Sequence, residues 1–432
     1  MIEYSKYRDS GIPWIGKIPA HWNILRGKNI LMLLERPVQE GDDIITCFRD
    51  GEVTLRKNRR EEGFTVSMKE IGYQGVETGD LVVHGMDGFS GAIGVSDSRG
   101  KATPVLNVMD SKENKRYLMY YLRAAAYKDV FMSLSTGIRV RSCDLRWNKL
   151  SVFPFLIPDI NEQDSIVTYI DNLVKRVDDI ICKAKVSIEE YKSWKASIIY
   201  EAVTKGLDSD VEMKDSGVEW IGDIPNSWDV LKLKYVIAFI ESGVSVNASQ
   251  SAAGEGKIGV LKTSSVSKYS FRPEENKEVN LDELDRVSCP VRANTIIVSR
   301  MNTPELVGAC GYVEQDYPNL FLPDRLWQVH FLNSVVVKYI WYYLSSNYIR
   351  NYYSSLSSGT SSSMQNISKG QFENARLLLP PPEVQRDIVE FLDKKCATLD
   401  SLVAEKESLI ADLEAYKKSL IFEVVTGKRR VV

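Results

Sequence analysis

The sequence is poor in the residues that metal sites and disulfide scaffolds require. It has three histidines and six cysteines in 432 residues. No cysteines form a CxxC pair and no histidines fall at metal-ligand spacing, so reduced thiols are expected rather than a disulfide or zinc framework. No run of 18 apolar residues occurs, and the first residues are polar, so neither a membrane span nor a signal peptide is expected. These absences predict a cytoplasmic protein.

The chain also lacks an excess of one charge. Its formal net charge is −3. Residues 1–158 hold 23 Lys and Arg against 19 Asp and Glu, whereas residues 215–380 hold 15 against 17. A mildly basic first part does not establish a nucleic-acid partner, and the near-neutral second part counts slightly against one.

Signatures of catalysis are absent as well. The sequence has no GxxxxGK[ST] phosphate loop and no Asn/Asp-Pro-Pro-aromatic motif of amino-methyltransferases. The tripeptide ExK, which occurs in some nucleases, appears at Glu113–Lys115 and Glu275–Lys277. Such tripeptides arise by chance in a chain with 26% charged residues, and no strand-borne carboxylate pairs with either. Catalysis by this chain is therefore not expected.

What the chain does contain is an internal repeat. The segment DSGIPWIGKIPAHW (9–22) recurs as DSGVEWIGDIPNSW (215–228), with nine of fourteen positions identical and no gap. A chain of this length is expected to form two or more domains. The repeat suggests that two of them are copies of one plan.

Four further pairs of segments match along the chain. They are SIIYEAVT (197–204) with SLIFEVVT (419–426), PDINEQDSIVTYID (158–171) with PPPEVQRDIVEFLD (380–393), YYL (120–122) with YYL (342–344), and LSTG (134–137) with LSSG (356–359). The first match is offset by 206 residues and all the later ones by 222. Each copy therefore has constant ends and a divergent middle. The period is too long for a solenoid, so we predict a tandem of two whole domains, each followed by the same tail.

Both tails have the periodicity of long helices. Apolar residues recur at alternating steps of four and three, which is a heptad seam. The predicted seam positions are Ile166, Ile170, Leu173, Val177, Ile180, Ala184, Tyr191, Trp194 and Ile198 in the first tail, and Ile388, Leu392, Leu399, Leu402, Leu409, Leu413, Tyr416 and Leu420 in the second. Each helix would span roughly 44 residues, or about 66 Å. Because each follows its own domain and the connecting linker is short, the two helices can pair only as an antiparallel coiled coil.

The two globular halves have mixed character. Buried strands are expected at 79–85 and 294–300, glycine-containing strands at 91–97 and 307–313, and short strands after each repeated phrase. Helical periodicity appears at 114–127 and 337–349. The predicted fold is therefore α+β: two tandem α/β domains separated by two long helices in an antiparallel coiled coil, with pseudo-twofold symmetry.

Two divergent domains, two matching helices and a doubled WIGxIPxxW phrase together resemble the specificity subunit of type I restriction–modification systems. The resemblance covers nearly the whole chain, and its motifs are strong because they occur twice at matching spacing. It implies the following limits: a first target recognition domain at 1–158, a spacer helix at 159–205, a linker at 206–214, a second target recognition domain at 215–380 and a second spacer helix at 381–427.

The resemblance also implies a function. Each recognition domain would read one half of a split site in double-stranded DNA, and the coiled coil would set the gap between the half-sites. Because the two middles differ, the target would be asymmetric. The helices would also dock two methyltransferase subunits, which restriction subunits would join. No cofactor is expected in this chain, since S-adenosylmethionine, ATP and Mg would serve the partner subunits.

Candidate DNA contacts follow from the loops at matching positions. TGIRVRS (136–142) corresponds to SGTSSSMQNIS (358–368), and in this family such a loop commonly lies at the DNA. Arginine suits guanine or phosphate, while amides and hydroxyls suit adenine edges or phosphate. The candidates are Arg139, Arg141, Thr360, Gln365 and Asn366 in these loops, Arg300 and Asn302 after a strand, and Arg56, Lys57, Arg59 and Arg60 in a basic cluster. A solvated loop or turn is the alternative interpretation of each group.

Two other functions stay open from the residues alone. One is a non-catalytic coiled-coil scaffold that binds protein partners, which the near-neutral charge favours. The other is a nuclease whose site the sequence does not disclose. The repeated phrase is more readily explained as structure, since Trp14, Trp22, Trp220 and Trp228 have the character of anchors that fasten each domain to a helix end.

Overall fold

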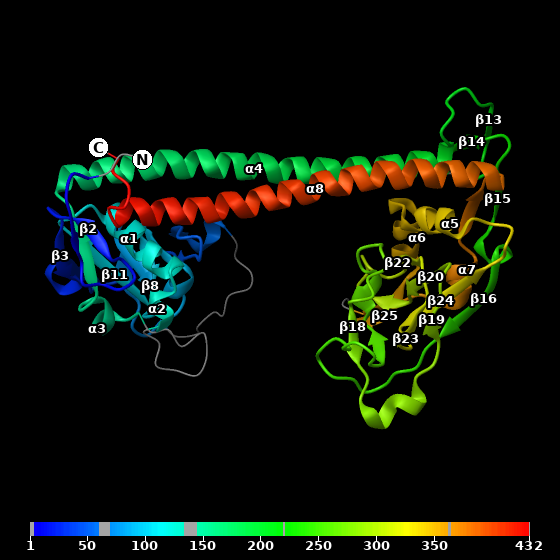
Figure 1. Cartoon of the computed structure of the whole chain (residues 1–432), viewed down its shortest axis with the longest axis horizontal. Helices are drawn as coiled ribbons and strands as arrows, with labels where there is room; N and C mark the ends of the chain where they lie inside the picture. Colours follow the sequence, from blue (N-terminus) through cyan, green and yellow to red (C-terminus); the bar gives the residue numbers. More distant parts are fainter. Residues whose placement is uncertain (1–3, 60–69, 134–144, 219–220, 362–363, 432) are drawn as a thin grey trace. The chain divides into compact units, whose positions relative to one another are not determined.

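The computed structural model describes residues 4–59, 70–133, 145–218, 221–361 and 364–431. The chain forms two compact units: Met1–Lys185 with Glu407–Val432, and Val186–Lys406. Each unit contains one globular domain and part of each long helix, α4 (Ile160–Lys205) and α8 (Pro382–Val425) (Figure 1). Within the described ranges, no helix combines the length and apolarity needed to cross a bilayer.

The first unit is built around a four-stranded sheet in the order β4-β11-β8-β9, packed against helix α1. Asn114 begins α1 by accepting hydrogen bonds from the backbone N–H groups of Arg116 and Tyr117. The elements of the domain are β1 (Tyr7–Asp9), β2 (Lys17–Pro19), β3 (Asn23–Arg26), β4 (Leu31–Leu33), β5 (Ile45–Cys47), β6 (Val53–Leu55), β7 (Gln74–Val76), β8 (Leu81–His84), β9 (Ile93–Val95), β10 (Gly100–Ala102), β11 (Leu106–Ser111), α1 (Lys115–Tyr127), α2 (Val130–Ser133), α3 (Trp147–Leu150) and β12 (Pro154–Ile157).

The second unit repeats this plan with a larger β insert. Its central sheet has the order β16-β24-β20-β22, and a second sheet has the order β18-β17-β23-β19. The elements are β13 (Met213–Asp215), β14 (Asp223–Pro225), β15 (Asp229–Lys232), β16 (Ile237–Ser242), β17 (Gly259–Leu261), β18 (Asn276–Glu278), β19 (Pro290–Val291), β20 (Thr295–Ser299), β21 (Met301–Asn302), β22 (Cys310–Val313), β23 (Tyr317–Phe321), β24 (Leu326–Phe331), α5 (Val337–Ser345), α6 (Asn347–Leu356), β25 (Ser358–Ser361), β26 (Met364–Asn366), α7 (Lys369–Glu373) and β27 (Arg376–Leu379). Helix α5 lies between the long helices and the central sheet (Figure 1).

The same hydrogen bonds hold the frame of each unit, shifted by 222 residues. Buried Gln163 donates from Nε2 to the carbonyl of Pro158, 3.0 Å away, and buried Gln385 donates to that of Pro380, 2.8 Å away. Equivalent tyrosines bind equivalent backbone carbonyls at 2.9 Å: Tyr117 to Leu156 and Tyr339 to Leu378. The repeat in the sequence is therefore a repeat of specific buried contacts.

The two long helices run antiparallel within each unit. In the first unit, Ile166 and Ile170 near the start of α4 share a core with Val424 near the end of α8, while Asp178 further along α4 pairs with Lys417 at 2.5 Å. In the second unit, the end of α4 shares a core with the start of α8, and Lys195 pairs with Asp400 at 2.7 Å. Advancing along one helix thus means going back along the other, as the linker length predicted.

The predicted seam was only partly right. Val177, Ala184, Leu392 and Leu399 are buried as expected, but Ile181 and Ile188 occupy seam places instead of their predicted neighbours. Ile180, Trp194, Leu409 and Tyr416, all assigned to the seam, are exposed. A straight helix has 3.6 residues per turn rather than 3.5, so a strict heptad count drifts off the buried face along a long helix.

The repeated phrase serves as an anchor. Trp22 and Trp228 are buried in the cores of their units, and each lies against a glycine at positive φ just past a helix end, Gly427 and Gly206 respectively. Strand β3, which follows Trp22, pairs with β12, the strand that leads into α4. Trp14 is partly buried against the first core, and Trp220 lies outside the described residues.

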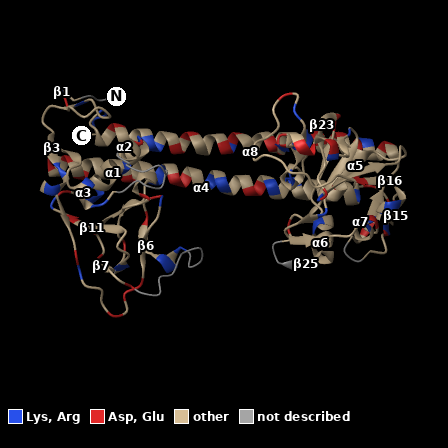
Figure 2. Ribbon diagram, turned by 90° about the horizontal axis from the view of Figure 1, so that it is seen from below, with Lys and Arg blue, Asp and Glu red and all other residues tan. Residues whose placement is uncertain are grey.

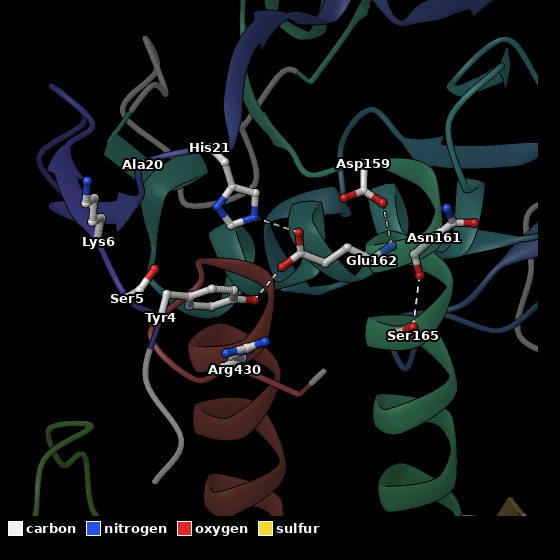
Figure 3. A pocket seen from close by; sticks show the side chains of 10 residues that line it. All are labelled: Tyr4, Ser5, Lys6, Ala20, His21, Asp159, Asn161, Glu162, Ser165 and Arg430. Carbon is white, nitrogen blue, oxygen red and sulfur yellow. Dashed lines mark hydrogen bonds and ion pairs between the residues drawn. The ribbon is translucent and has the colours of Figure 1, made fainter.

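The start of the chain closes over the start of α4 in the first unit. The hydroxyl of Tyr4 donates to Glu162 at 2.7 Å, and His21 bonds the other carboxylate oxygen at 2.9 Å (Figure 3). Arg430, from the other end of the chain, lies over the Tyr4 ring at 5.9 Å. Burial and the bond to Glu162 raise the pKa of the Tyr4 phenol, so it stays a donor. Both chain ends are therefore fixed to the first unit.

The fold class predicted from the sequence is confirmed: an α+β protein with two β-rich domains and two long helices packed together. The domain limits stay a prediction. The helices themselves are observed at Ile160–Lys205 and Pro382–Val425.

Candidate nucleic-acid interface

The second unit brings together the two candidate loops of its domain. Strand β21 pairs with β26, which pairs with β25, in a three-stranded sheet of polar residues. In this pairing Asn302 lies opposite Gln365, and Met301 lies opposite Asn366. Residues more than sixty positions apart, chosen separately from the sequence, therefore form one surface.

Two side chains of this polar sheet hold atoms that lack a hydrogen-bond partner. Within the described part of the chain, the buried Nε of Arg300 and the buried Oδ1 of Asn366 accept or donate no hydrogen bond. The backbone around Arg300 is fixed by bonds with Arg325 at 3.1 Å and Ile367 at 3.0 Å. A buried polar atom without a partner destabilises a fold by about 1–3 kcal/mol, which a bound ligand can recover.

The remaining members of the sheet differ in what can be said of them. Asn302 is half-buried, and its Oδ1 accepts from the backbone N–H of Thr303 at 2.9 Å, which fixes the amide. Thr360 belongs to β25, but its side chain lies outside the description. Sequence reasoning missed the exposed Arg325, which the backbone bond brings beside Arg300. No periodic signal marks this residue, because it lies in the loop between β23 and β24.

The basic cluster of the first unit is largely engaged with carboxylates. Lys57 pairs with Asp43 at 2.5 Å. Arg59 pairs with Asp50 at 2.7 Å and lies over the Phe48 ring at 4.2 Å. These pairs are exposed, so each is weak and can exchange for a phosphate at modest cost. The structure therefore places the cluster on the surface, with its positive charge partly compensated.

Arg56 and the remaining candidates complete the first domain. Arg56 donates from Nε to Thr46 Oγ1 at 3.3 Å. Arg60, Arg139 and Arg141 lie outside the described residues. The segment that holds Arg139 and Arg141 is followed by Leu145, whose N–H donates to the carbonyl of Gly85 at 2.8 Å.

The loop after β8 in the first unit matches the position of the Arg300 loop. His84 Nδ1 accepts from the backbone N–H groups of Met86 and Asp87, at 3.2 and 3.0 Å. Burial lowers the pKa of His84, which keeps the ring neutral and able to accept both bonds. Arg49 pairs with Asp87 at 3.1 Å. The loop is thus held by its own histidine and presents the half-exposed Met86 and its neighbours.

The described residues offer no arrangement for catalysis by metal. Within them, no group of three His, Cys, Asp or Glu side chains converges as metal ligands do. Both ExK carboxylates hold structural bonds: Glu113 accepts from Gln163 at 2.6 Å, and Glu275 accepts from Ser264 at 2.6 Å. The bond from Ser264 and nearby Arg272 lower the pKa of Glu275, so it is ionised and already paired.

Comparison with known proteins agrees with this architecture. Residues 225–410 match the family described as "Type I restriction modification DNA specificity domain". The chain is 27% identical over 188 residues to the type I restriction enzyme EcoEI specificity subunit of Escherichia coli, a match that covers 43% of this chain and 32% of that relative. It is 20% identical over 434 residues to the EcoKI specificity subunit of Escherichia coli strain K12, covering 96% of this chain and 90% of the relative.

A solved structure extends the comparison to the fold. A chain from a study of complex assembly and conformational transition of the type I restriction–modification system superposes with a TM-score of 0.67 at 14% identity. The superposition covers 94% of this chain and 98% of that one. At this identity the likeness establishes the arrangement of elements alone.

The repeated frame, the paired helices and the matched domain define the class as DNA specificity proteins of restriction–modification systems. The chain belongs to the family of type I restriction–modification specificity subunits, and it is the DNA specificity subunit of such a system, itself non-catalytic. The resemblance inferred from the sequence is confirmed.

Proposed function

We propose that each unit reads one half of an asymmetric, bipartite DNA target, and that the paired helices set the gap between the halves. The observation that carries the proposal is the contrast within the repeat. The frame contacts recur at an offset of 222 residues, whereas the candidate contact surfaces differ between the units. One frame with two unlike surfaces suits two unlike half-sites at a fixed phase along the duplex.

In the second half-site, we assign base contact to the polar sheet. Arg300 offers a guanidinium fork suited to guanine O6 and N7, and Asn302, Gln365 and Asn366 offer amides suited to adenine N6 and N7. Thr360 supplies a hydroxyl for a base edge or a phosphate. The partnerless Arg300 Nε and Asn366 Oδ1 support this assignment, because a base edge would complete their hydrogen bonding.

In the first half-site, we assign base or phosphate contact to Arg139 and Arg141. The basic cluster of Arg56, Lys57, Arg59 and Arg60 would contact phosphates, which position the protein without carrying sequence information. Its exposed ion pairs support a phosphate role, since each carboxylate can be left for a phosphate oxygen of the same charge.

We further propose that the helices dock two methyltransferase subunits. The seam error has a consequence here: Trp194 is 55% exposed and Tyr416 is 48% exposed, and they lie 222 residues apart at equivalent positions of the repeat. Exposed aromatic residues are enriched at protein interfaces. Lys, Arg, Asp and Glu are interspersed along α4 and α8, so neither sign dominates the helices (Figure 2). One equivalent aromatic anchor in each unit favours two copies of the same partner.

The chemistry would then belong to the partners. Methyltransferase subunits would supply S-adenosylmethionine-dependent methylation of adenine, and restriction subunits would use ATP and Mg. The complex would act in the cytoplasm, where host DNA is accessible.

A segment exchange tests the proposal. Replacing residues 29–150 with the segment of another specificity subunit should change the first half-site and leave the second half-site and the gap unchanged. Methylated adenines mapped in cells that express the exchanged chain with its methyltransferase measure the result. A change in both half-sites would contradict independent reading by each unit.

A salt series separates DNA reading from a scaffold role. With the methyltransferase bound, fluorescence anisotropy on duplex DNA should show affinity falling steeply with salt, because counterions are released from neutralised phosphates. A protein scaffold would show no such slope. Magnesium-dependent plasmid cleavage that Glu113→Gln or Glu275→Gln abolishes would instead establish a nuclease.

A further inference from the structure

A pocket in the second unit has no part in the DNA reading proposed above. It has a volume of about 870 Å³, within the range of small-molecule sites. Its walls come from α4, α8, α5, the start of α6 and the segment Lys268–Ser270. The pocket thus joins the constant frame of the repeat to parts found only in the second copy.

The two carboxylates of the wall are already neutralised. Asp400 accepts two bonds of 2.7 Å from Lys195. Asp393 accepts from the Tyr342 hydroxyl at 2.6 Å and pairs with Lys338 at 3.0 Å. Neither carboxylate is left to repel an anion.

Three further cations line the pocket, and they exceed the negative charge of its walls. They are Lys192, Lys268 and Arg350. Arg350 is the most fixed: its guanidinium lies over the Tyr269 ring at 4.3 Å and donates to Asn347 Oδ1 at 3.0 Å. Its buried Nε has no hydrogen-bond partner in the described structure. A cavity with excess positive charge and low-dielectric walls concentrates anions.

The pocket also has aromatic and apolar walls. Trp341 donates from Nε1 to the carbonyl of Tyr269 at 3.1 Å, so its polar atom is satisfied and the indole is held in place. Tyr269 itself adopts a φ of 56°, a backbone conformation that is unfavourable for a large side chain. Ile199, Ala397 and Cys396 add apolar surface from the two long helices. Fixed rings beside free cations suit a ligand that is flat at one end and anionic at the other.

The chemistry of the pocket is not required by the frame. The positions 222 residues from Trp341 and Lys192 hold Met119 and Glu414 in the other copy. The ion pair between Lys195 and Asp400, in contrast, recurs as Lys417 with Asp178. The frame therefore keeps its pairing in both copies, while the cations and the indole that distinguish the pocket occur in one.

We propose that this pocket binds a nucleotide, with its phosphates at Lys192, Lys268 and Arg350 and its base against the aromatic wall. An inorganic anion would leave the aromatic and apolar wall unused, and a neutral nucleoside would leave the cations unused. The nucleotide alone satisfies both. Bound there, it would contact the recognition domain and both helices of the second unit, and so stabilise that unit.

Calorimetric titration of the purified full chain with ATP, pyrophosphate and adenosine tests the proposal. ATP should bind, and pyrophosphate and adenosine should each bind at least about tenfold more weakly. Ala397→Glu should weaken ATP binding by about tenfold or more, because it places a carboxylate on the exposed helical surface that lines the pocket. Arg350→Gln should weaken it as well.

Two variants serve as controls. Ala404→Glu makes the same change two turns further along α8, at an exposed position outside the lining, and should leave ATP binding unchanged. Asn302→Ala with Gln365→Ala removes amides of the polar sheet and should also leave it unchanged. The proposal is overturned if ATP fails to bind at about 5 mM, if pyrophosphate binds as tightly as ATP, or if Ala397→Glu and Ala404→Glu bind ATP equally.

Discussion

The end of α8 completes the core of the first unit, and a single substitution there should destabilise a domain that begins hundreds of residues earlier. Leu420 is 1% exposed and belongs to one buried cluster with Trp22, Tyr117 and Ile170. Leu420→Ala removes three buried carbon atoms and leaves a cavity, which lowers the free energy of unfolding by about 2–5 kcal/mol. Leu409→Ala, on the same helix but 40% exposed, should lower it by less than about 1 kcal/mol.

Hydrogen exchange locates the effect. A loss of about 3 kcal/mol should speed exchange roughly 100-fold for amides of α1 that exchange when the first unit opens, since 1.4 kcal/mol corresponds to a factor of ten. Amides of α5, in the second unit, should keep their rates. If Leu420→Ala left α1 unchanged, or accelerated α1 and α5 equally, the assignment of the α8 end to the first core would be refuted.

Three further outcomes follow from the contacts of the frame and the thiols. Gln163→Leu and Gln385→Leu should each lower the stability of their own unit by about 2–4 kcal/mol in urea titrations, because each leaves a buried backbone carbonyl and a backbone N–H unpaired; a loss under about 0.5 kcal/mol would contradict this. A double-mutant cycle of Lys195→Ala and Asp400→Ala should give a coupling below about 1 kcal/mol that shrinks with salt, whereas a larger, salt-independent value would show a desolvated pair. Burial raises the pKa of Cys47 and Cys310 to about 12, so at pH 8 both stay protonated and should resist a thiol reagent that modifies exposed Cys182; rapid modification of either in the folded chain would contradict their burial.

The frame was predictable from the sequence because it is written twice. The strands at Leu81–His84 and Thr295–Ser299, and the helix at Lys115–Tyr127, follow strong apolar patterns of period two or 3.6. The antiparallel helix pairing followed from the short linker. What failed was the residue-level seam: Trp194 was placed in it by a heptad count and is exposed. Periodicity alone could not correct that count, because the drift of a straight helix depends on what packs beside it.

The candidate interface was predictable in its residues but not in its assembly. Asn302 and Gln365 were each chosen for their chemistry, yet their cross-strand pairing depends on β21 and β26, strands of two and three residues. Such short strands carry no usable periodicity. The partnerless Nε of Arg300 is likewise a property of three-dimensional packing. Sequence identifies which side chains could contact a base, and structure identifies which of them share a surface.

The most direct test of the account is a map of methylated adenines made with the polar sheet altered. In cells that express the methyltransferase with the Asn302→Ala, Gln365→Ala chain, the account predicts a bipartite target in which the second half-site is relaxed, by about 1–3 kcal/mol per lost base contact, while the first half-site and the gap are unchanged. Lys257→Ala, an exposed cation elsewhere on the same domain, should leave the whole target unchanged. A target without two separated parts, or an altered first half-site, would contradict the claim that each unit reads its own half.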